Sequence, residues 1–260
     1  MENPRLYGER PNVVVLVHGG PGAPGTMAPV ARELSSQWGV VEPLQTADSL
    51  EGQVRELRDA IMTHADPPVT LIGSSWGAML SFIVAARHPE LVRKLILIGS
   101  GVFETQYAVG IDPERMRRLT PEDRQELDRL TAMMSDPDVD KNEIFAAMGH
   151  VFTKTDALDP ITLDTEMIEG QFNIFQRVWN EAAAYRASGD FVALGRNIRC
   201  PVVAIHGDYD PHPVEGVRDP LSRVLSDFRF ILLEECGHLP WIERRARERF
   251  FEILREEIAT

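Results

Sequence analysis

Short apolar runs alternate with longer amphipathic segments along most of the chain. Six of these runs are rich in β-branched residues and predict strands. Because they are apolar at consecutive positions, both faces of each strand are expected to be buried, as in a parallel sheet. The runs are Val13–Val17, Val40–Leu44, Val69–Ile72, Leu95–Ile98, Val202–Ile205 and Phe230–Leu233.

Helical patterns fill the intervals between the first strands, at Ala28–Gln37, Leu50–His64 and Gly77–Arg87. The last of these is apolar nearly all round, so it is expected to be a central helix packed on the sheet. The C-terminal segment has one apolar stripe, formed by Ile242, Ala246, Phe250, Leu254 and Ile258. This alternation predicts an α/β fold with a mostly parallel central sheet flanked by helices. The segment before Val13 has room for at most one further strand.

The fourth and fifth predicted strands are too far apart in sequence for an ordinary crossover connection. Helical patterns occupy the interval, at Pro121–Met134, Lys141–His150 and Met167–Ala187, and Thr120 is placed to cap the first of them. We therefore expect a core domain formed by residues 1–102 and 196–260, with residues 103–195 inserted as a helical lid, or cap.

Composition narrows the class of protein. A hydrophobic share of 43% in 260 residues is enough for a large core, and the net charge of −13 disfavours nucleic-acid partners. No apolar run approaches the ~20 residues of a membrane span, and no apolar signal follows Met1. Cys200 and Cys236 are expected roughly 20 Å apart, on the rise per strand residue. The expectation is therefore a cytoplasmic protein with reduced thiols and a small-molecule substrate.

The most specific motif is Gly73-Ser74-Ser75-Trp76-Gly77, between a predicted buried strand and the central helix. It fits the G-x-S-x-G nucleophile elbow, in which a strand turns at once into a helix and the serine takes a strained backbone conformation. The glycines are required because side chains at those positions would collide. Ser75 is the expected nucleophile, and the helix N-terminus would direct amides towards a developing oxyanion.

A second motif, His18-Gly19-Gly20-Pro21-Gly22, follows the first predicted strand. Glycines there allow the backbone to approach a substrate and to offer a second oxyanion donor. His18 and Gly19 are therefore candidate substrate-binding residues, with an ordinary Gly-Pro turn as the alternative. No G-K-[ST] follows that would indicate phosphate binding.

The base and the acid are expected in the loops after the last two strands. His238, in Cys236–Trp241, can reach the elbow because the carboxyl ends of parallel strands share one sheet edge. Asp210 is the expected acid that orients it, with Asp208 as a turn-capping alternative. The resulting order Ser75, Asp210, His238 is that of α/β-hydrolases. No His, Cys or Asp cluster has metal-ligand spacing, and no cofactor or metal is expected.

On these motifs the chain resembles the α/β-hydrolase superfamily over nearly its whole length. The resemblance implies Ser75 as nucleophile, His238 as base, Asp210 as its orienting acid, and the amides of Gly20 and Trp76 as the oxyanion hole. His-Gly-Gly-Pro-Gly with Gly-x-Ser-Trp-Gly is similar to the prolyl iminopeptidase branch, which removes an N-terminal proline and holds its amine with acidic lid residues. Glu181, in Val178–Glu181, resembles such a residue.

Several readings stay open on the sequence alone. Val41–Ser49 lacks the Asp-Gln-Arg-Gly-x-Gly-x-Ser motif of that branch, so a carboxylesterase or lactonase is an equal alternative to a proline aminopeptidase. A hydrolase-fold ligand receptor is the non-enzyme alternative. Residues 111–170 hold 15 acids against 7 bases, which indicates solvated helix surfaces or an acidic vestibule. Phe172, Phe175, Val178 and Trp179 would form either the lid core or an acyl pocket. The oligomeric state is not predicted.

Overall fold

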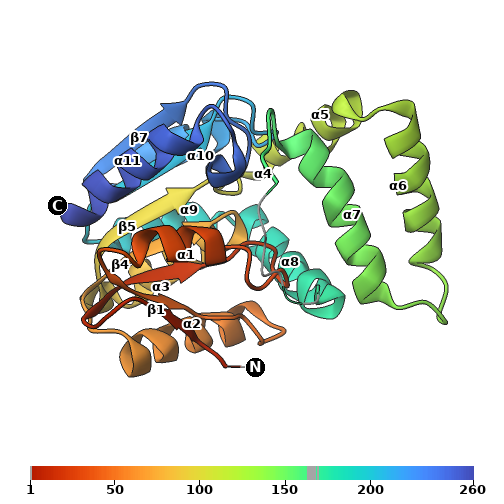
Figure 1. Ribbon diagram of the computed structural model, residues 1–260. Helices are drawn as coiled ribbons and strands as arrows, with labels where there is room; N and C mark the ends of the chain where they lie inside the picture. Colours follow the sequence, from red (N-terminus) through yellow and green to blue (C-terminus); the bar gives the residue numbers. More distant parts are fainter. Residues whose placement is uncertain (1, 163–167, 169) are drawn as a thin grey trace.

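The computed structural model describes residues 2–162, 168 and 170–260, and in this part of the chain seven strands form one sheet. The strand order is β1–β3–β2–β4–β5–β6–β7 (Figure 1). β1 runs antiparallel to β3, and all other neighbours are parallel, so the predicted mostly parallel sheet is confirmed. The strands are β1 (Arg5–Tyr7), β2 (Asn12–Val17), β3 (Gly39–Glu42), β4 (Val69–Ser74), β5 (Val92–Ile98), β6 (Val202–Gly207) and β7 (Phe228–Leu233).

The two edge strands differ most from the sequence pattern. β1 occupies the short segment before Val13 and was not marked by an apolar run, because it pairs along one side only. β7 is the opposite edge, and its side chains are half-buried or exposed up to Leu232, which is 46% exposed. The expected burial on both faces is therefore wrong for β7, since no described strand lies beyond it.

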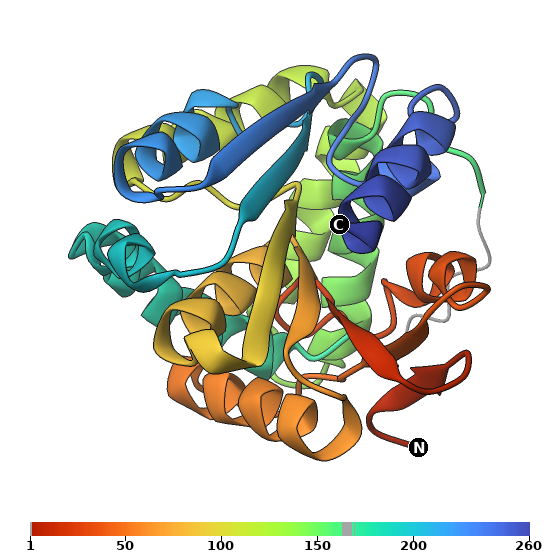
Figure 2. The ribbon, with the colours of Figure 1, turned by 90° about the vertical axis from the view of Figure 1, so that its left-hand side faces the viewer.

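Helices cover both faces of the sheet (Figure 2). One buried cluster joins the sheet to α2 (Leu50–His64), α3 (Trp76–Arg87), α9 (Asp190–Leu194) and α10 (Glu215–Val224). The other cluster joins the opposite face to α1 (Ala28–Leu34) and α11 (Arg247–Ala259). α3 is buried along nearly its whole length, as its all-round apolar sequence predicts. Among the described residues, no helix has the length and apolarity to cross a bilayer.

Between β5 and β6 the chain forms α4 (Thr105–Ala108), α5 (Ile111–Arg118), α6 (Pro121–Met133), α7 (Lys141–Asp156) and α8 (Phe172–Ala187), followed by α9. α6 and α7 stand away from the sheet (Figure 1) and bury a small cluster of their own around Leu130. The Thr120 side chain accepts a hydrogen bond from the Asp123 amide, as expected of an N-cap. α7 continues past His150, and Met167 lies outside the described residues.

The parallel register brings the functional loops to one edge of the sheet. Val17 pairs with Gly73, Ser74 with Ile98, and Gly207 with Leu233. The segments after β2, β4, β6 and β7 therefore leave the sheet side by side. This shared edge is where the glycine loop, the elbow and the loops of Asp210 and His238 meet.

Gly73→Ala should destabilise the protein, because a Cβ at this position would lie 2.2 Å from the carbonyl oxygen of Gly77. A backbone collision of this kind typically costs roughly 1–3 kcal/mol. Urea unfolding followed by circular dichroism measures the change. Gly149→Ala is the matched control, because its Cβ would meet nothing within 4 Å. Equal stability of the two variants would contradict the close approach described here.

Candidate functional site

Ser75 stands at the turn between β4 and α3 in a conformation that few non-glycine residues adopt. Its φ of 54° and ψ of −117° lie outside the allowed regions for ordinary side chains, and such strain is maintained only where surrounding packing enforces it. The enforcement is visible on both sides. A Cβ on Gly73 would strike Gly77, and one on Gly77 would lie 2.2 Å from the Val17 carbonyl oxygen. The Ser75 side chain is thereby presented at the sheet edge.

Two backbone segments flank this serine. Trp76 is the first residue of α3, so its amide is one of the N–H groups that have no partner within a helix. Gly19 is so close that a Cβ there would lie 3.1 Å from the Ser75 Cβ. Gly20 has a φ of 113° and lines the same cavity as Ser75. The structure thus brings Gly19, Gly20, Ser75 and Trp76 together, as the sequence suggests.

His18 does not line the cavity of Ser75; it is bonded to backbone groups in the interior. It is fully buried, its Nδ1 lies 2.8 Å from the Gly19 carbonyl oxygen, and its Nε2 accepts from the Gln45 amide at 3.0 Å. A carbonyl only accepts, so Nδ1 carries the proton. Burial lowers the pKa of His18 to about 4, against a small opposing effect of the Gly19 hydrogen bond. His18 is therefore a neutral residue that orders the glycine loop.

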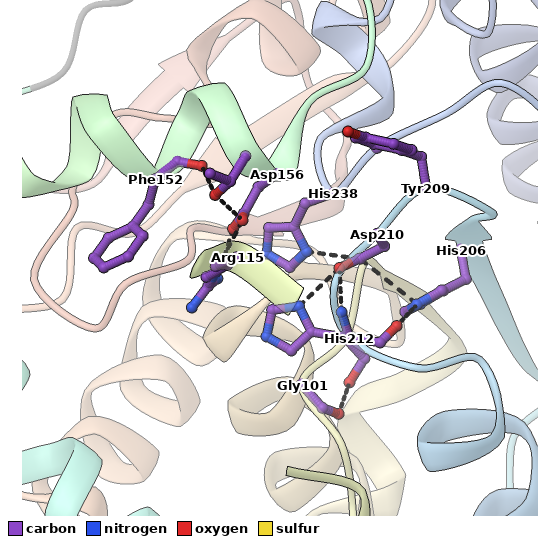
Figure 3. Close-up of polar contacts among 12 residues, drawn as sticks. Gly101, Arg115, Phe152, Asp156, His206, Tyr209, Asp210, His212 and His238 are labelled. Atoms are coloured by element: carbon purple, nitrogen blue, oxygen red, sulfur yellow. Dashed lines mark hydrogen bonds and ion pairs between the residues drawn. The ribbon is translucent and has the colours of Figure 1, made fainter. Parts of the chain in front are cut away.

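Asp210 and His238 are directly paired at the same edge. The Nδ1 of His238 lies 2.7 Å from Asp210 Oδ2, and both residues are buried (Figure 3). Asp208, the alternative acid, instead accepts from the Cys236 amide at 3.1 Å. The Ser75 amide donates to the Ile98 carbonyl at 2.9 Å, and a Cβ on the next residue, Gly99, would lie 3.2 Å from His238 Nδ1. Ser75 and His238 therefore flank the same two residues at the end of β5.

The charges in this pair are strongly coupled. Burial alone would raise the pKa of Asp210, but the neighbouring His238, His212 and His206 outweigh it and hold this pKa well below its usual value. Burial alone would lower the pKa of His238, but the charge and hydrogen bond of Asp210 outweigh it and raise this pKa. The carboxylate is thus ionised, and the imidazole beside it has increased basicity.

His212 is a second histidine on the same carboxylate, and sequence reasoning gave it no role. Its Nδ1 lies 2.7 Å from Asp210 Oδ1, and its ring stacks on that of His238 with centroids 4.6 Å apart (Figure 3). The signal in the sequence is the Asp210-Pro211-His212 run, because a residue two positions after an aspartate can bond back to its side chain.

Asp210, His212 and His238 also place three potential metal-ligating atoms within 4.8 Å of one another. Sequence spacing did not indicate this cluster, because its members come from two separate loops. Both Nδ1 atoms point at the carboxylate, however, so the three groups satisfy one another as a hydrogen-bonded network. A cation at these atoms would have to displace those protons.

The loop of His238 is tied to the base of α7. The His238 amide donates to the Asp156 carbonyl at 2.7 Å. The buried carboxylate of Glu243 accepts from the amides of Gly237, Leu158 and Asp159 at 2.8–2.9 Å. Burial raises the pKa of the neighbouring Cys236 thiol, so this cysteine stays protonated. Glu243 is therefore a structural support for the His238 loop that no sequence motif marks.

A cavity of about 430 Å³ opens next to Ser75 beneath α5–α8. Ser75, Gly20 and His212 lie on its inner wall, and its outer wall is mostly aromatic or methionine side chains. Arg115 from α5 is the basic residue of this wall, and Asp156 holds its guanidinium through two hydrogen bonds of 2.8 and 2.5 Å. The residues of the outer wall are Asp112, Arg115, Thr131, Met134, Phe145, Met148, Gly149, Phe152, Phe172, Phe175 and Trp179.

The two lid residues proposed from the sequence have different places. Trp179 lines the cavity, with its ring 6.3 Å from that of Trp76. The Glu181 carboxylate accepts from the Leu50 amide at 2.7 Å, at the first residue of α2, and Glu181 is not among the residues that line the cavity of Ser75. Phe172 and Phe175 also line the cavity, whereas Val178 is buried in the core.

Glu243→Gln should lower the free energy of unfolding by about 1–3 kcal/mol, because one of three backbone donors would face an amide N–H instead of an oxygen. Chemical denaturation measures this change. Glu248→Gln, at an exposed position of α11, is the control and should be within about 0.5 kcal/mol of the parent. A neutral Glu243→Gln would show that the carboxylate does not hold the loop.

Comparisons with known proteins agree with this architecture. The family model described as the alpha/beta hydrolase fold matches residues 46–244. A proline iminopeptidase of Lactobacillus helveticus (strain DPC 4571) is 26% identical over 92% of this chain and 88% of its own length. A pyrrolizixenacetamide deacetylase of Xenorhabdus hominickii is 30% identical, over 45% of this chain and 48% of its own.

Among solved structures, VinJ superposes with a TM-score of 0.69 at 20% identity, over 98% of this chain and 94% of that one. At this identity the likeness concerns the fold alone. Together with the match over most of the sequence, the seven-stranded sheet and its flanking helices lead to one conclusion. The chain belongs to the α/β-hydrolase family.

Proposed function

We propose that the protein is a serine hydrolase that cleaves small esters, lactones or amides through an acyl-enzyme on Ser75. The observation that carries the proposal is the 2.7 Å contact between His238 Nδ1 and Asp210, which lies beside the end of β5, where the Ile98 carbonyl accepts from the Ser75 amide. A serine hydroxyl needs such a base because it is hardly ionised at neutral pH.

The chemistry follows from the free atoms of these residues. Because His238 Nδ1 is committed to Asp210, Nε2 is the atom that takes the Ser75 proton as the oxygen attacks the substrate carbonyl. The amides of Trp76 and Gly20 donate hydrogen bonds to the carbonyl oxygen and stabilise the negative charge that develops on it. His238 then gives the proton to the leaving group as the substrate bond breaks. In the second half a water molecule attacks the acyl carbonyl while His238 takes its proton, and His238 returns this proton to the Ser75 oxygen as the ester bond breaks and the acid leaves.

The walls of the cavity favour an apolar acyl group. Phe145, Phe175 and Trp179 form a continuous aromatic row, with centroids 4.7 Å apart for the first pair and 6.1 Å for the second. A volume of about 430 Å³ lies in the range of small-molecule pockets. Trp179 of this row and Ser75 line the same cavity, so an apolar acyl chain bound along the row would extend from a carbonyl at Ser75.

A proline aminopeptidase is the second candidate, supported by the similarity to the Lactobacillus helveticus enzyme over most of both chains. Such an activity requires an acid that binds the substrate amine. Glu181 on α8 does not supply it, because its carboxylate binds the Leu50 amide at the start of α2 and does not line the cavity. Asp112 does line the cavity, but the basic Arg115 lies 3.9 Å from it. We therefore rank ester and lactone cleavage above release of an N-terminal proline.

Ser75→Ala should lower kcat/KM by several orders of magnitude, because it removes the nucleophile and leaves only the oxyanion donors and substrate binding. Hydrolysis of p-nitrophenyl acetate, p-nitrophenyl butyrate and proline p-nitroanilide by both proteins measures this. Butyrate should exceed acetate, and the proline amide should be the slowest. Turnover that persists in Ser75→Ala would exclude the serine mechanism. Efficient Ser75-dependent release from the proline amide would instead reverse the ranking of substrates.

The pH profile of kcat/KM should show an acid limb with its midpoint above about 6.5, the usual pKa of histidine. The base must be neutral to accept a proton, and Asp210 raises the pKa of His238 against the effect of burial, so activity is lost as pH falls through this raised value. His18, with a pKa of about 4, cannot produce the limb. Stopped-flow ester hydrolysis across pH 5–9 tests this, with exposed His150→Gln as a control. A midpoint below 6 would contradict the assignment of His238.

A further inference from the structure

Asp210 is shared between two imidazoles, whereas the proposed reaction uses one. His238 takes Oδ2, and His212 binds Oδ1 twice, through its ring Nδ1 at 2.7 Å and its backbone amide at 2.9 Å. All three side chains are buried. His212 thus holds Oδ1 while its ring stacks on that of His238, and it sets the direction in which Oδ2 points.

The protonation of His212 follows from its partners. A carboxylate accepts hydrogen bonds and donates none, so His212 Nδ1 carries a proton, and its Nε2 is unprotonated in the neutral ring. The charged and titratable groups packed around the two rings are Asp210, His206, Arg115 and Asp156. Burial lowers the pKa of His212 against the opposing charge and hydrogen bond of Asp210, and the charges of His238 and Arg115 lower it further. Two stacked cationic rings beside Arg115 would repel, so His212 is the neutral partner.

The position of His212 is itself fixed from behind. His206 Nε2, at the end of β6, donates to the His212 carbonyl at 2.8 Å. In the loop between these residues, His206 therefore binds the backbone at His212, and His212 binds the Asp210 carboxylate. In this arrangement both carboxylate oxygens of Asp210 are hydrogen-bonded, with Oδ2 directed at His238.

We propose that His212 is a positioning residue, which locks Asp210 in the orientation that faces His238 and takes up part of the negative charge that would otherwise act on that ring. The proposal rests on the serine hydrolase function proposed above. His212 also lines the cavity of Ser75, so the competing possibility is that His212, rather than His238, is the base.

Two substitutions separate the hydrogen bond from the packing. His212→Phe keeps a stacked ring but removes the Nδ1 donor, whereas His212→Asn places an amide donor where Nδ1 stood. In His212→Phe, the negative charge of Asp210 is no longer shared with a second imidazole, so it stabilises protonated His238 more strongly. The acid limb of kcat/KM should therefore move up by about half a unit to one pH unit. The plateau of kcat/KM should fall about tenfold, because the carboxylate can then rotate together with the bound His238 ring, which no longer holds its Nε2 towards Ser75. His212→Asn should restore both values towards those of the parent.

A measurement that does not depend on catalysis, the titration of the His238 imidazole itself, keeps this test independent of the proposed function. On a Ser75→Ala background, NMR titration of the His238 imidazole should show the same upward shift when His212 is replaced by Phe, and a smaller one with Asn. If Ser75→Ala alone leaves turnover intact, the serine mechanism fails, while the titration still decides the role of His212. If His212→Phe does not fold, His212→Gln replaces it, because its donor lies at the Nε2 position and misses the carboxylate.

Three results would overturn the proposal. The first is an acid limb and an imidazole titration that stay unchanged in the Phe or Gln variant, since His212 would then only fill space. The second is a downward shift of the His238 titration. The third is loss of activity in the His212 variants while His238→Ala retains it, which would make His212 the base.

Discussion

A buried negative charge is the interaction on which the site depends. The Asp210 carboxylate has no exposed surface, and an unpaired carboxylate in that position would be strongly destabilised. Its partners come from three places: His206 from the end of β6, His212 from the loop that follows, and His238 from the loop after β7. Satisfying one anion therefore fixes the relative position of two strand ends and the loops that leave them.

α5 and α7 are connected to the same network by hydrogen bonds and charges. Arg115 on α5 is held by Asp156 at the end of α7, and the Asp156 carbonyl accepts the His238 amide. Glu243 then gathers backbone donors from the chain that leaves α7 and from the residue before His238. The position of His238 and that of α5 and α7 over the cavity consequently depend on the same hydrogen-bond partners. A movement of either one would change the other.

The sequence predicted those parts of the site that depend on local geometry and sheet topology. The elbow at Gly73–Gly77 is a short, recognisable motif, in which Gly73 is required by contact with Gly77, and Gly77 by contact with the end of the neighbouring strand at Val17. Asp210 and His238 follow from the rule that parallel strands end at one edge. The environments of Arg115, Glu243 and Glu181 depend instead on how α5–α8 pack over that edge. Contacts such as Glu181 with Leu50 join residues far apart in sequence, and no motif announces them.

The same distinction explains the errors in the elements. Continuous apolar runs marked the inner strands well, but β7 has a similar composition and is an edge strand with half-exposed side chains. Whether a strand is buried depends on the strands and helices packed beside it, and the composition of the strand does not show which these are. β1 is the converse case, because a three-residue strand that pairs on one side has too few positions for a pattern.

The separate packing of α6 and α7 has a consequence for how such a protein diversifies. Leu127, Leu130 and Ile144 form a small core that shares no residue with either cluster on the sheet, and Met134, Met148 and Phe152 pack on it while lining the cavity. Substitutions at these three positions would change the shape of the cavity while the sheet keeps its packing. Selection for new substrate specificities can therefore act on the part of the cavity wall that α6 and α7 supply, at little risk to the folding of the sheet and its helices.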